Sequence, residues 1–261
     1  MQIFVCVKDA IDWNLSTKDF RIDRVSNEPT VSFARYRIDE YDEIALEVAL
    51  QVRDRSGGTI RALSVGSEAT EDILKHALSM KADAATLIEA QLPVEDKVSL
   101  LCAAIRRQGP FKAVLCGLMS SGSGTGATGP SLAEELEVPC ISNITSIEAG
   151  PDRWRVRRET SEAFEELAVM PPFVGTVTNA ECNLPRAPTM KDKIRAFRQQ
   201  VEVLRPADLA PYTSGYARSR LRIVRRYVPH SSRECRKVGG DAVEKAREVA
   251  SYVRRILPQF A

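Results

Sequence analysis

Apolar side chains gather in short runs along the first part of the chain, and the first run sets the pattern. In residues 2–8, both the odd and the even positions are apolar. Strands of a parallel sheet have this pattern because helices cover both faces of such a sheet. We therefore predict buried strands over 2–8, 59–65, 84–89, 112–116 and 173–178.

Amphipathic segments with helical period separate these runs. They predict helices over 39–55, 68–80, 94–107 and 130–136. Strands that alternate with helices are typical of an α/β fold, here a doubly wound, mostly parallel and Rossmann-like sheet. Ligands of such sheets bind beyond the carboxyl ends of the strands. We expect the segments after Cys6, Val65 and Cys116 to surround one crevice there.

The second half of the chain departs from this alternation. Three extended pieces joined by turns, over 141–148, 153–159 and 163–170, predict a small antiparallel meander. We assign residues 1–200 to a nucleotide-binding α/β domain. Residues 201–261 are assigned to a C-terminal arm, ending in a helix from Asp241 to Leu257 that packs on a partner subunit.

The segment from Gly117 to Pro130 is rich in glycine, serine and threonine, and it lies between a predicted strand and a predicted helix. A strand, a glycine-rich turn and a helix amino terminus direct free backbone N–H groups at one point, which favours an anion. A flexible surface loop is the alternative, and the flanking elements disfavour it. The spacing fits neither a P-loop nor a dinucleotide fingerprint. We predict phosphate binding.

Composition narrows the function classes. The 261 residues are 44% hydrophobic and carry a net charge of only +2. Six scattered cysteines and two histidines disfavour a metal site or disulfide framework. The amino terminus has no leader-like pattern, and no apolar run approaches a membrane span, so we expect a cytoplasmic protein. Basic segments at 191–198 and 218–237 lack a nucleic-acid-binding motif, which disfavours that function.

No catalytic constellation is predicted, because no nucleophile, base and orienting group occur together in the sequence. Residues 179–198 include a short basic amphipathic stretch that begins at Met190. A plain surface loop would explain it. The alternative is a docking loop, since an exposed methionine beside steering charge suits a protein partner.

Several motifs, in order along the chain, match a known family. They are Val-Cys-Val-Lys (5–8) followed by Asp12, Tyr-Asp-Glu-Ile-Ala-Leu-Glu (41–47), Ala-Leu-Ser-Val-Gly (62–66), Ala-Leu-Ser-Met-Lys-Ala-Asp (77–83), and Asn-Leu-Pro-Arg (183–186) with Thr189 and Met190. The chain therefore resembles the beta subunit of electron transfer flavoprotein.

The resemblance implies an electron carrier rather than an enzyme by itself. The chain would form a heterodimer with an alpha subunit that holds FAD, and would bind AMP or, in bifurcating members, a second FAD. Electrons would come from an acyl-CoA or other dehydrogenase and pass to a downstream acceptor. Two alternatives stay open: an electron-bifurcating NADH-oxidising subunit with a second FAD, and a stand-alone adenine-nucleotide sensor.

The resemblance also implies site residues. The nucleotide would contact Cys6, Asp39, Glu40, Tyr41, Asp42, Val65, Ser120, Ser121, Gly122, Ser123, Gly124, Thr125, Gly126, Ala127 and Thr128. The dehydrogenase would dock on Asn183, Pro185, Arg186 and Met190. The C-terminal arm would wrap around the alpha subunit. The loop departs from the family pattern, because Gly122 and Gly124 replace acidic residues and Ala127 replaces glutamine. Backbone contacts and Thr128 would therefore carry the binding.

Overall fold

The structure is a computed structural model that describes residues 1–12, 20–23, 29–31, 36–90, 94–209, 224–227, 235 and 237–257. The chain divides into two units. The first comprises residues 1–19 and 31–224, and the second comprises 20–30 and 225–261. The first unit contains the predicted α/β fold.

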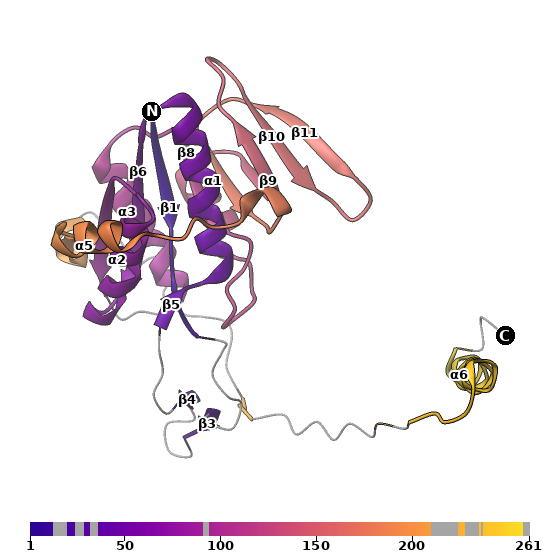
Figure 1. Cartoon of the computed structure of the whole chain (residues 1–261). Coiled ribbons are helices and arrows are strands. Elements are labelled where there is room, and N and C mark those ends of the chain that lie inside the picture. Colours follow the sequence, from indigo (N-terminus) through magenta and orange to yellow (C-terminus); the bar gives the residue numbers. More distant parts are fainter. Residues whose placement is uncertain are drawn as a thin grey trace. The chain divides into compact units, whose positions relative to one another are not determined.

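The first unit is organised around a nine-stranded sheet (Figure 1) in the order β11-β10-β9-β12-β8-β1-β6-β7-β13. Strands β9, β12, β8, β1, β6, β7 and β13 are parallel neighbours, and β10 and β11 continue the sheet antiparallel to β9. The strands are β1 (Gln2–Cys6), β6 (Thr59–Gly66), β7 (Ala84–Glu89), β8 (Ala113–Gly117), β9 (Cys140–Glu148), β10 (Trp154–Glu159), β11 (Phe164–Val169), β12 (Phe173–Val177) and β13 (Glu202–Leu204). The predicted meander is thus one end of the main sheet.

Helices cover both faces of the sheet, as a doubly wound fold requires. Buried side chains of α1 and α2 share one core with Ile3 and Val5 of β1, while those of α3 and α4 share the other core with Phe4 and Cys6. This alternation explains why every position of the first strand is apolar. The helices are α1 (Glu40–Ser56), α2 (Glu71–Ser79), α3 (Val94–Gln108), α4 (Thr128–Leu136) and α5 (Met190–Arg198).

Several features of the first unit were not predicted. Helix α5 forms within the stretch that we interpreted as a loop, and a capping box between Thr189 and Asp192 fixes its start. Strand β13 adds to the edge of the sheet beside β7, and the 3₁₀ helix η4 (Pro206–Leu209) packs against α3. Before α1, β2 (Asp9–Ile11) pairs with β5 (Tyr36–Ile38). Two further 3₁₀ turns are η2 (Glu68–Thr70) and η3 (Glu181–Asn183).

The second unit contains a two-stranded sheet and the C-terminal helix. Strands β3 (Phe20–Ile22) and β4 (Pro29–Val31) form the sheet. Helix α6 (Ala242–Ile256) is capped by Asp241 through a capping box, as predicted, and none of its residues is buried. Much of the predicted arm between β13 and α6 lies outside the described residues, so its packing on a partner stays a prediction. Within the described ranges, no helix is long and apolar enough to cross a membrane.

Candidate functional site

The main pocket lies where the order of the strands reverses. From β1 the sheet grows one way through β6 and β7, and the other way through β8 and β12. A crevice opens beyond the carboxyl ends of β1 and β8, because the connections that follow them leave toward opposite faces. The pocket holds about 800 Å³ when its open mouth is included, which is the size of a typical ligand site.

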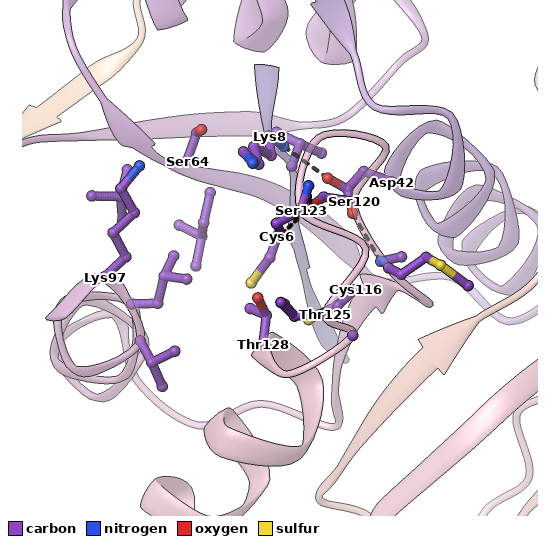
Figure 2. Close-up of a pocket in the computed structure, with 18 residues that line it drawn as sticks. Cys6, Lys8, Asp42, Ser64, Lys97, Cys116, Ser120, Ser123, Thr125 and Thr128 are labelled. Atoms are coloured by element: carbon purple, nitrogen blue, oxygen red, sulfur yellow. Dashed lines mark hydrogen bonds between the residues drawn. The ribbon is translucent and has the colours of Figure 1, made fainter. Parts of the chain in front are cut away.

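The pocket is lined by both apolar and polar side chains, and polar groups lie on two of its sides. Figure 2 shows Lys97 and Ser64 on one side of the cavity, and the loop with Ser120 and Ser123 across from them. The lining residues are Cys6, Val7, Lys8, Asp42, Leu63, Ser64, Val65, Lys97, Val98, Leu101, Cys116, Gly117, Met119, Ser120, Ser123, Thr125, Gly126 and Thr128. This mixed lining suits a ligand that has both apolar and polar groups.

The glycine-rich loop is a tight turn with a fixed backbone. Gly124 and Gly126 both have φ of +62°, a left-handed conformation that favours glycine. The Gly124 amide donates to the Ser120 carbonyl oxygen at 2.8 Å. Helix α4 begins at Thr128, and its N-cap residue Ala127 makes no side-chain cap. Pro130 has no amide hydrogen, so the amides of Thr128 and Gly129 are the groups of the first turn of α4 that remain available to an anion.

Two carboxylates at the start of α1 hold this loop. The amide and the hydroxyl of Ser121 both donate to Asp39 Oδ2, each at 2.7 Å. Asp42 accepts from the amides of Lys8 and Gly117, both at 2.9 Å, and so joins the ends of β1 and β8 (Figure 2). Asp39 is the N-cap residue of α1 but makes no side-chain cap, because its carboxylate is bound to the loop.

Gly117 is where the loop leaves β8, and a side chain does not fit there. A Cβ at this position would lie 2.6 Å from Asp42 Oδ1 and 2.7 Å from the Cβ of Tyr41. Such distances are far below van der Waals contact, and the neighbours are the start of a packed helix. The absence of a side chain at Gly117 therefore lets α1 and the loop approach each other.

Two ionisable groups that line the pocket, Asp42 and Lys97, have shifted pKa values. Burial raises the pKa of the Asp42 carboxyl to about 7, although hydrogen bonds from the Gly117 and Lys8 amides lower it. Burial also lowers the pKa of Lys97, and the positive charge of Lys8 lowers it further. An anion bound between the two ammonium groups would relieve their repulsion.

Two cysteines line the pocket, Cys6 on β1 and Cys116 on β8. A hydrogen bond with Cys6 and, next in size, burial raise the pKa of the Cys116 thiol well above its usual range. A protonated thiol reacts slowly, so Cys116 acts as a small wall residue. In the described ranges, no three His, Cys, Asp or Glu side chains gather as metal ligands.

The structure brings together about half of the predicted nucleotide residues at the pocket. Cys6, Asp42, Val65, Ser120, Ser123, Thr125, Gly126 and Thr128 line it. Asp39, Glu40, Tyr41, Ser121, Gly122, Gly124 and Ala127 do not line it, although Asp39 and Ser121 fix the loop.

The prediction missed the wall formed by α3, namely Lys97, Val98 and Leu101. A lysine near the start of a helix, where the dipole favours carboxylates, was an available signal.

The predicted docking residues have different environments. Met190 is 72% exposed, whereas Asn183 is 1% exposed and donates through Nδ2 to the Thr145 carbonyl oxygen at 2.6 Å. Arg186 is bound to Glu47 and Pro185 is half-buried. Three other apolar side chains near them are exposed but were not predicted to contact a partner, namely Leu184, Ile194 and Phe197.

The sheet and its pocket define a doubly wound α/β protein with a ligand-sized crevice at the switch point. A sequence model of the electron transfer flavoprotein domain matches residues 31–209. The chain therefore belongs to the electron transfer flavoprotein family, and its similarity is to the beta subunits of that family.

Three bacterial relatives, each called electron transfer flavoprotein subunit beta, match most of the chain. The protein of Bacillus subtilis (strain 168) is 29% identical over 85% of this chain and 87% of its own length. That of Thermoanaerobacterium thermosaccharolyticum is 29% identical over 80% of each chain. That of Clostridium acetobutylicum is 27% identical over 97% of this chain and 96% of its own. The similarity thus extends over nearly the whole chain.

Proposed function

We propose that this chain is the electron-carrier subunit of a heterodimer. With an FAD-bearing alpha subunit, it accepts electrons from acyl-CoA or other dehydrogenases and passes them to a downstream acceptor. The observation that carries the proposal is the pocket at the switch point, with its glycine-rich loop, in a chain of this family. The flavin supplies the electron-transfer chemistry when it is bound, and this chain supplies binding and orientation.

The pocket on this chain is proposed to hold an adenine nucleotide, AMP in the leading form of the proposal. The residues present fit such a group. Apolar side chains of β6 and α3, including Leu63, Val65 and Leu101, would pack against the base. The hydroxyls of Ser123, Thr125 and Thr128 and the amides at the start of α4 would bind phosphate.

The two lysines support an anionic ligand independently of the loop. Lys8 follows β1, Lys97 lies on α3, and their charges are close enough for Lys8 to lower the pKa of Lys97. Two ammonium groups that face one cavity are stabilised when an anion binds between them. We expect Lys97→Ala to weaken nucleotide binding about tenfold, since a charge-assisted hydrogen bond contributes roughly 1.5–3 kcal/mol. Lys112→Ala, at an exposed lysine that does not line the pocket, is the matched control.

The alpha subunit is proposed to cover helix α6. Its apolar side chains include Val249, Val253 and Ile256, each at least 41% exposed. Their spacing places them along one face of the helix. An amphipathic helix with no buried residue needs a partner to cover that face.

The decisive experiment is coexpression with the alpha subunit, followed by extraction of the bound nucleotides and their identification by mass. The proposal expects a yellow heterodimer with one FAD and one AMP. Two FAD molecules per heterodimer would instead support the bifurcating alternative. A colourless chain that binds ATP or AMP as a homodimer would support the nucleotide sensor instead. A chain that retains no nucleotide would overturn the assignment of the pocket.

A further inference from the structure

The segment that joins β12 to α5 is bound to the middle of α1 by a nearly buried ion pair. Arg186 donates through Nε to Glu47 Oε2 at 2.8 Å and through Nη2 to Glu47 Oε1 at 2.9 Å. The backbone amide of Arg186 also donates to Glu47 Oε2, at 3.2 Å. The side chain of Glu47 is only 6% exposed. One carboxylate thus binds both the side chain and the main chain of the segment.

Further bonds hold the same segment at other points. Arg186 Nη1 lies 2.9 Å from Asp54 Oδ2, and Gln51 Nε2 donates to the Cys182 carbonyl oxygen at 2.9 Å. Positions 47, 51 and 54 share one face of α1, because residues three and four apart are neighbours on a helix. Figure 1 shows the segment, in orange, running across α1 from η3 to α5.

The segment and the helix α5 that follows it present apolar side chains to solvent. Leu184 is 78% exposed, Met190 is 72% exposed, and Phe197 is 80% exposed. Basic residues surround the last two, namely Lys191, Lys193, Arg195 and Arg198. The polar groups of the segment thus bind inward to α1 while its apolar groups point outward.

We propose that Arg186 is a positioning residue for the dehydrogenase, rather than a residue that contacts it. This rests on the proposed function. The ion pair with Glu47 holds the segment in the conformation in which Leu184 and Met190 are presented together. Without Arg186, the segment would lose its anchor and Glu47 would remain as a buried charge without its partner. The dehydrogenase would then have to order the segment on binding, which weakens its affinity.

Arginine is required here because of its planar guanidinium group. Nε and Nη2 of Arg186 donate to the Glu47 carboxylate, while Nη1 donates to Asp54. Hydrogen bonds with Glu47 raise the pKa of the Arg186 guanidinium above its ordinary value. Lysine offers a point charge without this geometry. The Arg186→Lys variant should therefore retain only part of the function that Arg186→Gln loses.

The test uses the heterodimer and an acyl-CoA dehydrogenase of the same organism that reduces the wild-type complex. We expect Arg186→Gln to raise the KM for the dehydrogenase at least tenfold, with kcat within twofold and bound nucleotide unchanged. Hydrogen exchange of residues 181–189 should become faster. Met190→Ala should raise KM without changing this exchange. Arg155→Gln, which breaks an exposed ion pair with Glu148, should change neither quantity.

Unchanged exchange in Arg186→Gln would overturn the proposal, and so would faster exchange with an unchanged KM. Should Arg186→Gln fail to fold, the double variant with Glu47→Gln removes the orphaned charge and must show the same fast exchange and raised KM. If no dehydrogenase reduces the wild-type complex, the proposed function fails. The exchange measurement alone then still supports or overturns the positioning of the segment by Arg186.

Discussion

Helix α1 holds two loops of different character. Its first turn binds the glycine-rich loop through Asp39 and Asp42, and its middle turns bind the 181–189 segment through Glu47 and Gln51. The glycine-rich loop has few large side chains, and in the proposed function it offers backbone amides to a small ligand. The second segment and the helix α5 that follows it carry exposed apolar side chains, which are proposed to contact a protein.

The difference shows that polar residues on a mostly buried helix position two sites without lining both of them. A site built from backbone amides needs the loop to approach the helix closely, so its most sensitive position is Gly117, which packs against α1. A protein-docking site needs exposed side chains on an ordered segment, so its most sensitive position is the ion pair between Arg186 and Glu47 that anchors the segment. The substitutions below should separate these requirements.

The largest expected effect is that of Gly117→Val. The added side chain would overlap Asp42 and Tyr41, so α1 and the loop would move apart. We expect a loss of about 3 kcal/mol in the free energy of unfolding, together with loss of bound nucleotide. Urea unfolding and nucleotide content measure the two effects. Gly239→Val is the control, since no atom lies within 4 Å of a Cβ at that glycine, which is outside the pocket. A Gly117→Val protein that unfolds like the wild type would show that the two elements are not packed together.

The next effect is that of Arg186→Gln on stability. Breaking a buried ion pair costs about 3–5 kcal/mol, and the 28% exposure of Arg186 reduces this to about 2 kcal/mol. The nucleotide content should stay at the wild-type level, because the two loops bind different turns of α1. Glu47→Gln in the same chain should restore part of the stability, as measured by urea unfolding. Loss of nucleotide in Arg186→Gln would mean that the two loops are coupled through α1.

The third effect concerns pH. The folded pKa of Asp42 is about 7, above its ordinary value of 3.8, so between these values the folded protein binds a proton that the unfolded chain releases. The contribution of Asp42 to stability is therefore fully present below pH 4 and declines as pH rises to 7. Since one pKa unit corresponds to about 1.4 kcal/mol, we expect a decline of a few kcal/mol, which should be absent from the Asp42→Asn variant. Unfolding curves from pH 4 to 8 measure it, and parallel pH profiles of the two proteins would refute the assignment.

The parallel sheet and the glycine-rich turn were predictable because local pattern determines them. Runs of apolar residues gave β1, β6, β7 and β8 within one or two residues, and the turn at Gly124 needs a conformation that favours glycine. The contacts between distant residues were not predictable. The bond between Asp39 and Ser121 spans 82 positions, and the pattern around Asp39 indicates only a helix start.

The docking segment shows the same limit. The sequence Asn-Leu-Pro-Arg at 183–186 indicated a partner surface, and the interpretation assigned all of its polar residues to contact. In the structure, Asn183 and Arg186 turn inward to Thr145 and Glu47. Helix α5 also escaped prediction, because its basic stripe resembles a solvated loop, and only the capping box at Thr189 marks its start.

The smallest expected effect on stability is that of Phe197→Ser. This variant removes an exposed side chain proposed to contact the partner and leaves the ion pair of Arg186 and Glu47 intact. Phe197 is 80% exposed, so its loss should change the free energy of unfolding by less than about 0.5 kcal/mol. If α5 is part of the proposed docking surface, the KM for the dehydrogenase should still rise severalfold. Phe164→Ser, at an exposed phenylalanine on β11, is the matched control and should leave KM unchanged. Equal changes in KM for both variants would mean that the partner does not recognise α5.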